Sequence, residues 1–370
     1  MSEHHKHPPL ARPSIGSYHR NEWAIYGTTC SRIEELQSLI ADGLKEKFNS
    51  AYIDAHHGAP ISGNFLQSEE RKIHSPISIP DNVHRWRPLL ESADVVFING
   101  NHYAASRQIV VLDEKKKDSL KRRAPQLSRI DFVLKTEEVQ NLYDFLEELV
   151  DEHTVILEAH QTHTLISLLR SNLEERIPPV KALVLAGGKS QRMGHDKSQI
   201  SYKEGLSQEV YLTRICQGFG MEAYISKAHD HDTEEIAGIP VIKDRLLDMG
   251  PFGAIISAMM SDPDSAWMVL ACDLPYLDRG SLSRLMEERD PSKFATTYKS
   301  KHKAFAEPLI TIYEPRSYSA FLEMLTQGYS CPRKVIINTD VKVIELPDDL
   351  IIENVNTPEE LAAVKERLHG

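Results

Sequence analysis

The hydrophobic pattern of residues 20–175 alternates between short apolar runs and longer amphipathic segments. Each apolar run has the length of a buried strand, whereas the amphipathic segments place their apolar residues on one helical face. The expected strands are Glu22–Tyr26, Ser50–Ala55, Asp94–Ile98, Gln108–Leu112, Ile130–Leu134 and Thr154–Leu157, and the expected helices are Ser31–Phe48, Val83–Glu91, Thr136–Val150 and Thr162–Leu173. This alternation predicts a parallel α/β domain.

A second alternating pattern begins after Ile177-Pro178-Pro179. Because two successive prolines fit neither a helix nor a central strand, they indicate a short stiff linker. The expected organisation is a disordered polar tail at 1–19, a first α/β domain at 20–176, a linker at 177–180 and a second α/β domain at 181–370. The second domain is predicted to contain strands at Ala182–Ala186, Glu222–Ser226, Pro240–Lys243 and Trp267–Ala271, helices at Glu209–Phe219 and ending near Met259, and a hairpin at Lys299–Glu314. Parallel sheets are expected in both domains.

The 370-residue chain carries a net charge of −11, with 41% hydrophobic and 26% charged residues. This composition is ordinary for a globular protein, and the negative charge argues against bulk attraction to nucleic acid or to an anionic membrane. Four scattered cysteines without C-x-x-C spacing argue against a zinc site or a disulfide framework. No apolar run approaches the ~20 residues that span a bilayer, and the N-terminus lacks the apolar core of a signal peptide. We therefore expect a cytoplasmic protein.

The first predicted strand, the Gly27-Thr28-Thr29 turn and the helix after it have the layout of a phosphate-binding P-loop. The pattern GxxxxGK[ST] is absent, and no lysine occurs between Gly27 and Leu44, so the loop offers no such side chain to a β- or γ-phosphate. Ser31 is the expected N-cap of the helix, with Glu34 completing a capping box. The prediction is a P-loop-like domain that lacks a functional P-loop and does not hydrolyse GTP.

The stretch Lys181–Lys197, KALVLAGGKSQRMGHDK, carries the most informative candidate chemistry. An apolar strand leads directly into Gly187-Gly188, and paired glycines allow backbone N–H groups to approach a bound anion closely. Lys189, Arg192 and Lys197 place three cations within nine residues. This combination suits the binding of a triphosphate.

The string LAGGxSxRMGxDK in this stretch resembles the signature loop of the nucleotidyltransferases, and is most similar to that of the molybdenum cofactor guanylyltransferase family. The resemblance implies a Rossmann-like nucleotidyltransferase domain. It assigns catalysis to Arg192, Lys197 and Asp273, and nucleotide binding to Leu185, Ala186, Gly187, Gly188, Lys197, Ser226, Asp244, Gly250 and Asp273. The first domain, which contains the sequence DVVFINGNH, is similar to the GTP-binding accessory proteins of molybdopterin-guanine dinucleotide synthesis.

Asp273 follows the most apolar strand of the second domain, in the sequence CDLP. A carboxylate at such a place either caps a helix or binds a metal, and the resemblance of D-x-P to the family motif favours Mg²⁺. Because Mg²⁺ takes one or two carboxylates and completes its shell with phosphate oxygens and water, Asp273 alone is sufficient. By the same resemblance Asp244 precedes a GP-x-x-G turn in the nucleotide pocket. Two departures are the order Phe252-Gly253-Ala254, where the family has Leu-Ala-Gly, and Ser226, where the guanylyltransferases carry asparagine.

The C-terminal sequence NVNTPEE matches the N-x-NTPEE segment of the same family. In local terms, Thr357 before a proline and Glu360 three positions later predict a capped helix start. The resemblance assigns Asn354 and Asn356 to the acceptor side of the site, and Arg333 is a candidate for binding an anionic acceptor.

Taken together, these resemblances imply transfer of GMP from GTP to the terminal phosphate of molybdopterin, with Mg²⁺ as cofactor and pyrophosphate as the leaving group. Because a terminal phosphate with a second pKa of about 6 is already largely ionised, no general base is expected. Two alternatives stay open: the same fold acting with CTP or on a sugar phosphate, and a non-catalytic nucleotide-binding scaffold. The first domain is expected to bind a partner, such as a molybdoenzyme or a cofactor-insertion protein.

Overall fold

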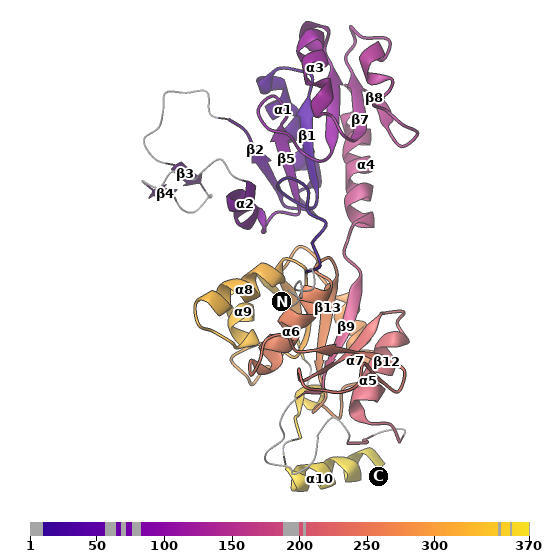
Figure 1. Cartoon of the computed structure of the whole chain (residues 1–370), viewed down its shortest axis with the longest axis vertical. Coiled ribbons are helices and arrows are strands. Elements are labelled where there is room, and N and C mark those ends of the chain that lie inside the picture. Colours follow the sequence, from indigo (N-terminus) through magenta and orange to yellow (C-terminus); the bar gives the residue numbers. More distant parts are fainter. Residues whose placement is uncertain are drawn as a thin grey trace, which may run out of the picture. The chain divides into compact units, whose positions relative to one another are not determined.

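The computed structural model describes residues 10–55, 64–67, 72–75, 83–187, 200–202, 205–346, 349–355 and 357–369. Ser14–Ile177 and Pro178–Gly370 each form a compact unit (Figure 1). Both units consist of a sheet with helices packed against it, which confirms the α/β fold class. Within the described residues, no helix is long and apolar enough to cross a membrane.

The sheet of the first unit is parallel throughout, as predicted. Its strands lie in the order β2 (Ser50–Ile53), β5 (Val95–Asn99), β1 (Glu22–Tyr26), β6 (Gln108–Leu112), β7 (Ile130–Lys135) and β8 (Val155–Glu158). β1 and β5 are buried along their whole length, and their sequences are apolar except for Glu22 and Asn99. A separate antiparallel hairpin is formed by β3 (Asn64–Gln67) and β4 (Lys72–Ser75).

Helices cover both faces of this sheet. α1 (Cys30–Leu44) and α4 (Thr162–Glu175) pack on the face that carries Trp23 and Ile25, while α3 (Lys117–Arg123) packs on the face that carries Ala24 and Tyr26. Alternate residues of one strand thus enter opposite cores. The short helix α2 (Val83–Trp86) and 3₁₀ turns at Arg87–Leu90, Glu114–Lys116, Ala124–Gln126 and Asp144–Leu146 complete the unit.

The helix predicted at Thr136–Val150 is wrong. This segment forms turns and the single 3₁₀ turn Asp144–Leu146, with Tyr143 and Leu146 buried against the sheet. Carboxylates at Asp144, Glu147 and Glu148 would lie three and four residues apart on a helix, where like charges repel. Burial of the apolar side chains in separate turns has overridden the local helical pattern.

The start of α1 also differs from the prediction. Thr29, rather than Ser31, is the N-cap, and its hydroxyl accepts a hydrogen bond from the Arg32 N–H at 3.4 Å. The helix therefore begins at Cys30 and ends at Leu44, four residues before the predicted end.

Part of the predicted tail belongs to the folded unit. The main-chain N–H groups of Ser17, Tyr18 and His19 donate to the Glu22 carboxylate at 2.6 to 2.9 Å, and the Tyr18 ring is buried. A buried carboxylate that accepts several N–H bonds holds the entering chain against β1. Residues 1–9 lie outside the described residues.

The second unit contains a mixed sheet rather than the purely parallel one that the sequence predicted. Its strands lie in the order β11 (Glu235–Ile236), β12 (Ile239–Lys243), β10 (Ala223–Lys227), β9 (Val180–Leu185), β13 (Ala266–Ala271), β15 (Ile310–Tyr313), β14 (Ala295–Lys299) and β16 (Val341–Glu345). β12, β10, β9 and β13 are mutually parallel, whereas β15 runs antiparallel to both β13 and β14. The hairpin predicted at Lys299–Glu314 is present as the antiparallel pair β14 and β15, but its first strand lies earlier than predicted and ends at Lys299.

Helices cover both faces of this sheet as well (Figure 1). α5 (Gln208–Gln217) and α7 (Arg279–Glu287) pack on one face, and α6 (Gly250–Ser261), α8 (Ser317–Thr326) and α9 (Pro332–Asn338) pack on the other. After the 3₁₀ turn Leu350–Ile352, the chain ends in α10 (Pro358–His369). Val355 and Val364 anchor this last segment on Tyr202 and Tyr276.

Candidate functional site

Four parallel strands end side by side at one end of the second sheet. β12, β10, β9 and β13 are neighbours in that order and point the same way. The residues at their carboxyl ends are Asp244 after β12, Ser226 in β10, Gly187 after β9 and Asp273 after β13. Ligands of open α/β sheets bind at this end of the strands. Predicted site residues that are far apart in sequence are thus brought to one place.

The exit of β9 is tightly packed against β10. Leu185 is the last residue of β9, and the Ala186 N–H donates to the Ser226 carbonyl at 3.1 Å. A Cβ atom on Gly187 would lie 3.2 Å from the main-chain nitrogen of Ala228, closer than most side chains tolerate. Glycine at 187 therefore permits a close approach of two backbones. The other predicted loop residues, Gly188, Arg192 and Lys197, lie outside the described residues.

Ser226 and Asp244 join the ends of β10 and β12. The buried Ser226 hydroxyl donates to the Asp244 carboxylate at 3.3 Å. Burial raises the pKa of Asp244 to about 6, and the hydrogen bond from Ser226 opposes that rise because it stabilises the ionised form. Gly250, which the resemblance placed in the same pocket, begins α6 six residues later.

Asp273 lies beside the C-terminal segment that was predicted to bind the acceptor. The Val355 N–H donates to the Asp273 carbonyl at 3.0 Å, so the exposed Asn354 is held next to the carboxyl end of β13. The Tyr202 ring is buried close by, and its pKa is raised by burial and by the neighbouring Cys272 and Asp273. Asn356 lies outside the described residues.

A divalent cation beside the carboxyl end of β13 could use the carboxylate of Asp273 as a protein ligand. Among the described residues, no three His, Cys, Asp or Glu side chains are grouped as a metal site. Asp273 is only half-buried, so phosphate oxygens and water can complete a coordination shell around a cation there. The donor set fits an ion that arrives with a nucleotide.

Arg333 lies beside the connection between β14 and β15. The Ala271 N–H donates to the Leu309 carbonyl at 3.0 Å, so the connection between β14 and β15 borders the end of β13. The guanidinium of Arg333, at the start of α9, lies 5.9 Å from the ring centroid of Phe305 in that connection. Arg333 is exposed.

One buried ion pair at this site was not predicted from the sequence. The Lys227 ammonium donates to the Glu209 carboxylate at 2.7 Å and to the Ala186 carbonyl at 3.2 Å. The Lys227 side chain is 5% exposed and that of Glu209 is 0% exposed. The only sequence signal was a lysine that ends the otherwise uncharged strand AYISK. Its partner on α5 follows from tertiary packing alone.

The corresponding loop of the first unit is arranged differently. The Thr28 hydroxyl and the Arg32 guanidinium both contact the buried Asp113 carboxylate, at 2.8 and 3.2 Å. These residues border a cavity of about 360 Å³ between the ends of β6 and β7. Because Arg32 is paired with Asp113, the positive charge of the Arg32 guanidinium is partly neutralised. The loop itself supplies no lysine.

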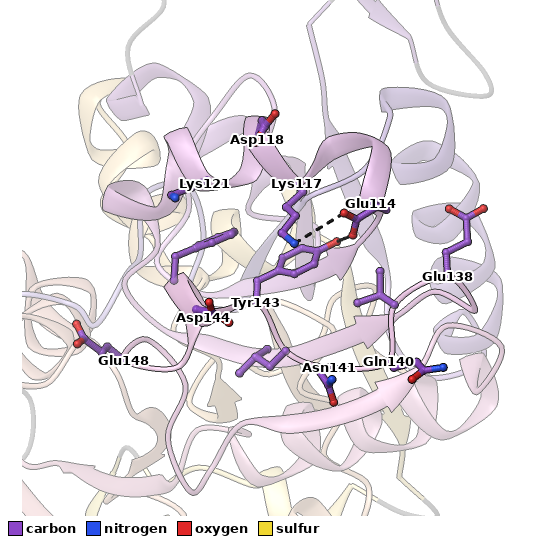
Figure 2. Close-up of a pocket in the computed structure, with 13 residues that line it drawn as sticks. Glu114, Lys117, Asp118, Lys121, Glu138, Gln140, Asn141, Tyr143, Asp144 and Glu148 are labelled. Atoms are coloured by element: carbon purple, nitrogen blue, oxygen red, sulfur yellow. Dashed lines mark hydrogen bonds and ion pairs between the residues drawn. The ribbon is translucent and has the colours of Figure 1, made fainter.

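A second cavity of the first unit, about 850 Å³, opens beside α3 and the turns after β7 (Figure 2). Tyr143 stands in its wall, where its hydroxyl donates to Glu114 at 3.3 Å and the Lys117 ammonium lies 4.6 Å from its ring centroid. Burial and Glu114 raise the pKa of Tyr143 to about 12. Five carboxylates and two lysines line this cavity, a charge balance that does not suit a triphosphate: Glu114, Asp118, Glu138, Asp144, Glu148, Lys117 and Lys121.

Comparison with known proteins identifies relatives of the second unit. Residues 182–342 match the family model described as a MobA-like NTP transferase domain. A Synechocystis protein named "Molybdenum cofactor biosynthesis bifunctional protein" is 32% identical over 190 residues, which cover 50% of this chain and 54% of that protein. The chain thus spans about half the length of this relative. A Trichormus variabilis protein named "Probable molybdenum cofactor guanylyltransferase" is 30% identical over 189 residues, which cover 50% of this chain and 89% of that protein.

Among solved structures, molybdopterin-guanine dinucleotide biosynthesis protein A from Archaeoglobus fulgidus aligns with a TM-score of 0.44 and 18% identity. The alignment covers 51% of this chain and 98% of that one.

Proposed function

The chain belongs to the MobA-like NTP transferase family, which includes the molybdenum cofactor guanylyltransferases, and from this premise we propose that its second unit transfers GMP from GTP to the terminal phosphate of molybdopterin. Pyrophosphate is the leaving group. The observation that carries the proposal is the convergence of Gly187, Ser226, Asp244 and Asp273 at one end of the sheet. The proposal includes a cytoplasmic location, which suits four cysteines without disulfide-type spacing.

In this proposal the loop after β9 holds the triphosphate. The N–H groups of Gly187 and Gly188 face the phosphates, and Arg192 and Lys197 neutralise the charge that develops on the departing pyrophosphate. Donors that are oriented before the reaction stabilise such charge most effectively because they need not reorganise. Ser226 and Asp244 lie on the side of β9 away from β13, which suits contacts to the nucleoside.

Asp273 is the proposed ligand of a divalent cation, Mg²⁺ in our proposal. When bound, the cation would supply positive charge that stabilises the phosphates of the nucleotide. Asn354, Asn356 and Arg333 are proposed to bind the acceptor, and the bond between the Val355 N–H and the Asp273 carbonyl supports this placement of Asn354. The acceptor phosphate is already ionised near neutral pH, so alignment and charge neutralisation are sufficient without a general base.

The first test is nucleotide binding to the whole protein in the presence of Mg²⁺, with GTP, CTP, ATP and UTP compared by calorimetry. We expect GTP to bind most tightly, and radiolabelled GMP to appear on molybdopterin in a transfer assay. Lys197→Ala should slow transfer roughly a hundredfold to a thousandfold with the fold intact. Lys293→Ala is the control, because Lys293 precedes β14 at the opposite end of the sheet and pairs with Asp340. Full activity of Lys197→Ala would contradict the assignment.

One observation favours a second candidate. The Ser226 hydroxyl is shorter than the asparagine side chain of the guanylyltransferases and is already bonded to Asp244. A base pocket with one donor fewer is less selective for guanine, so CTP is the alternative nucleotide. Preferential binding of CTP would keep the mechanism and change the product.

We also propose that the first unit binds a protein partner, such as a molybdoenzyme or a cofactor-insertion protein, and does not hydrolyse GTP. The absence of GTP hydrolysis is supported by the Arg32–Asp113 ion pair and by the lack of a lysine between Gly27 and Leu44. Partner binding is tested by affinity capture with the whole chain. The comparison is a chain that carries charge reversals on the exposed face of α1. Recovery of the same proteins by both chains would contradict it.

A further inference from the structure

The buried ion pair between Lys227 and Glu209 contacts Ala186, which precedes the Gly187-Gly188 pair that we assign to the nucleotide phosphates. Lys227 is the last residue of β10, and Glu209 lies in the first turn of α5. Both side chains are removed from water, at 5% and 0% exposure. A charge in such surroundings is tolerated only with a well-placed counter-charge and further hydrogen bonds.

The pair also fixes the orientation of one peptide group. The Lys227 ammonium donates to the Ala186 carbonyl at 3.2 Å while Glu209 holds the ammonium at 2.7 Å. In a planar trans peptide the C=O and N–H groups point in opposite directions. The N–H of the same peptide belongs to Gly187, so it points away from the buried pair. The direction of the first N–H group in the phosphate-binding loop is therefore determined by Lys227.

We propose that Lys227, held by Glu209, is a positioning residue for nucleotide binding. It orients the Ala186–Gly187 peptide so that the Gly187 N–H meets a phosphate oxygen without reorganisation. The close approach of the two backbones, which puts a Cβ atom built on Gly187 only 3.2 Å from the Ala228 nitrogen, places this peptide directly beside the end of β10. This inference rests on the proposed nucleotidyltransferase site, and it names two residues that neither the signature motif nor the family resemblance indicated.

The alternative is that the pair only stabilises the fold, and a double variant separates the two roles. Lys227→Met alone leaves the Glu209 carboxylate buried without its counter-charge, so it destabilises the protein. Lys227→Met combined with Glu209→Gln removes both charges and restores much of the stability. The double variant still lacks the bond to the Ala186 carbonyl. It therefore tests positioning in a well-folded protein.

We expect the double variant to melt near the wild-type temperature and yet to bind Mg²⁺-GTP about tenfold to a hundredfold more weakly, the usual effect of losing a hydrogen bond to a charged group. The KM for GTP should rise by the same factor, while the KM for molybdopterin stays unchanged. The matched control is Lys181→Met. Lys181 pairs with Glu222 at 2.8 Å at the opposite ends of the same two strands, so its loss affects stability but not the KM for GTP.

The outcomes are distinct. A double variant with wild-type melting temperature and wild-type affinity for GTP overturns the positioning role and leaves the proposed function intact. A wild-type protein that binds and transfers another nucleotide, with the same loss in the double variant, overturns the guanylyl assignment and supports the positioning role. A wild-type protein that binds none of the four nucleotides overturns both.

Discussion

The Ser226 hydroxyl donates a hydrogen bond to the Asp244 carboxylate at 3.3 Å, and this contact joins the carboxyl ends of β10 and β12. Burial favours the neutral form of Asp244, whereas the hydrogen bond favours the charged form. Burial has the larger effect, since it raises the pKa to about 6 from 3.8. The protonation of this carboxylate therefore changes in a pH range where enzymes are routinely assayed.

This pKa predicts a pH-dependent stability. Between about pH 4 and 6, folded Asp244 holds a proton that the unfolded chain has released, so its contribution to stability falls as the pH rises. Asp244→Asn lacks the ionisable group and escapes this loss. Because Asp244 is half-buried and partly screened by water, we expect the stability of the variant relative to wild type to increase by about 1 kcal/mol from pH 4 to pH 7. Urea unfolding of both proteins at the two pH values measures this difference in stability.

Ser226→Ala provides the matched comparison. It removes the bond that favours the ionised carboxylate, so the folded-state pKa, and with it the upper limit of the pH window, should move upward. If the stability difference between Asp244→Asn and wild type is the same at pH 4 as at pH 7, the Asp244 carboxylate is not desolvated.

The central features of the second unit could be predicted from the sequence. β13 is a continuous apolar run that is buried along its whole length, and β9 is apolar except for Lys181, so both are readily predicted as strands. Since these strands were expected to be parallel, the residues after them, Gly187 and Asp273, were expected at one end of the sheet. The structure brings both to that end.

Other features depend on contacts that no local pattern contains. The direction of β15, antiparallel to β13, is decided by tertiary pairing. The turns at residues 136–150 replace a helix because separate apolar side chains, such as Tyr143 and Leu146, are buried where a regular helix would not place them. The Lys227–Glu209 pair joins a strand end to a helix, so only the fold reveals it.

Asp273 can be tested by a substitution that keeps its main-chain contact with Val355. The substitution Asp273→Asn removes the negative charge but keeps the main-chain carbonyl that accepts the bond from Val355. We expect a stability within about 0.5 kcal/mol of wild type and a transfer rate lower by roughly a hundredfold to a thousandfold. Calorimetry with GTP, with Mg²⁺ or with EDTA, should show that the variant has lost the metal-dependent part of binding.

Asp278→Asn is the control for charge. Asp278 lies five residues further on and caps α7, accepting from the Ser281 N–H at 2.8 Å, a role that asparagine also fills. Equal effects of the two substitutions on GTP binding would argue against a specific role of Asp273.

Gly27 is the residue of the P-loop-like turn whose substitution should be most damaging. It adopts a φ of +89°, and a Cβ atom there would lie 2.1 Å from the Val111 carbonyl oxygen in β6. Gly27→Ala combines backbone strain with a clash against main-chain atoms, so we expect a loss of about 3 kcal/mol or more. Thermal unfolding followed by calorimetry measures the loss.

Gly220→Ala isolates the contribution of strain. Gly220 has a similar φ of +80°, but no atom lies within 4 Å of a Cβ built on it, so the cost should be only about 1 kcal/mol. Equal losses for the two variants would mean that the turn at Gly27 moves away from β6 when a side chain is added. If the units act independently, Gly27→Ala will retain the wild-type affinity for GTP below its unfolding temperature.

The start of α10 links helix capping to the acceptor side of the proposed site. Thr357 and Glu360 form a reciprocal capping box: the Thr357 hydroxyl accepts from the Glu360 N–H at 3.2 Å, and the Thr357 N–H donates to the Glu360 carboxylate at 3.1 Å. This confirms the helix start that the sequence predicted. Thr357→Ala should destabilise α10 by about 1 kcal/mol, which is roughly a fivefold acceleration of hydrogen exchange for its amides.

The same substitution should affect the acceptor more than the nucleotide. Val355, two residues before the cap, bonds to the Asp273 carbonyl, so loosening α10 releases Asn354 from its place beside β13. We expect the KM for molybdopterin to rise while the affinity for GTP stays constant. Thr357→Ser keeps the hydroxyl and should behave as wild type. The contrary result is faster hydrogen exchange in α10 of Thr357→Ala with the same KM for molybdopterin as in Thr357→Ser. It would show that α10 does not influence acceptor binding and that Asn354 has only a structural role.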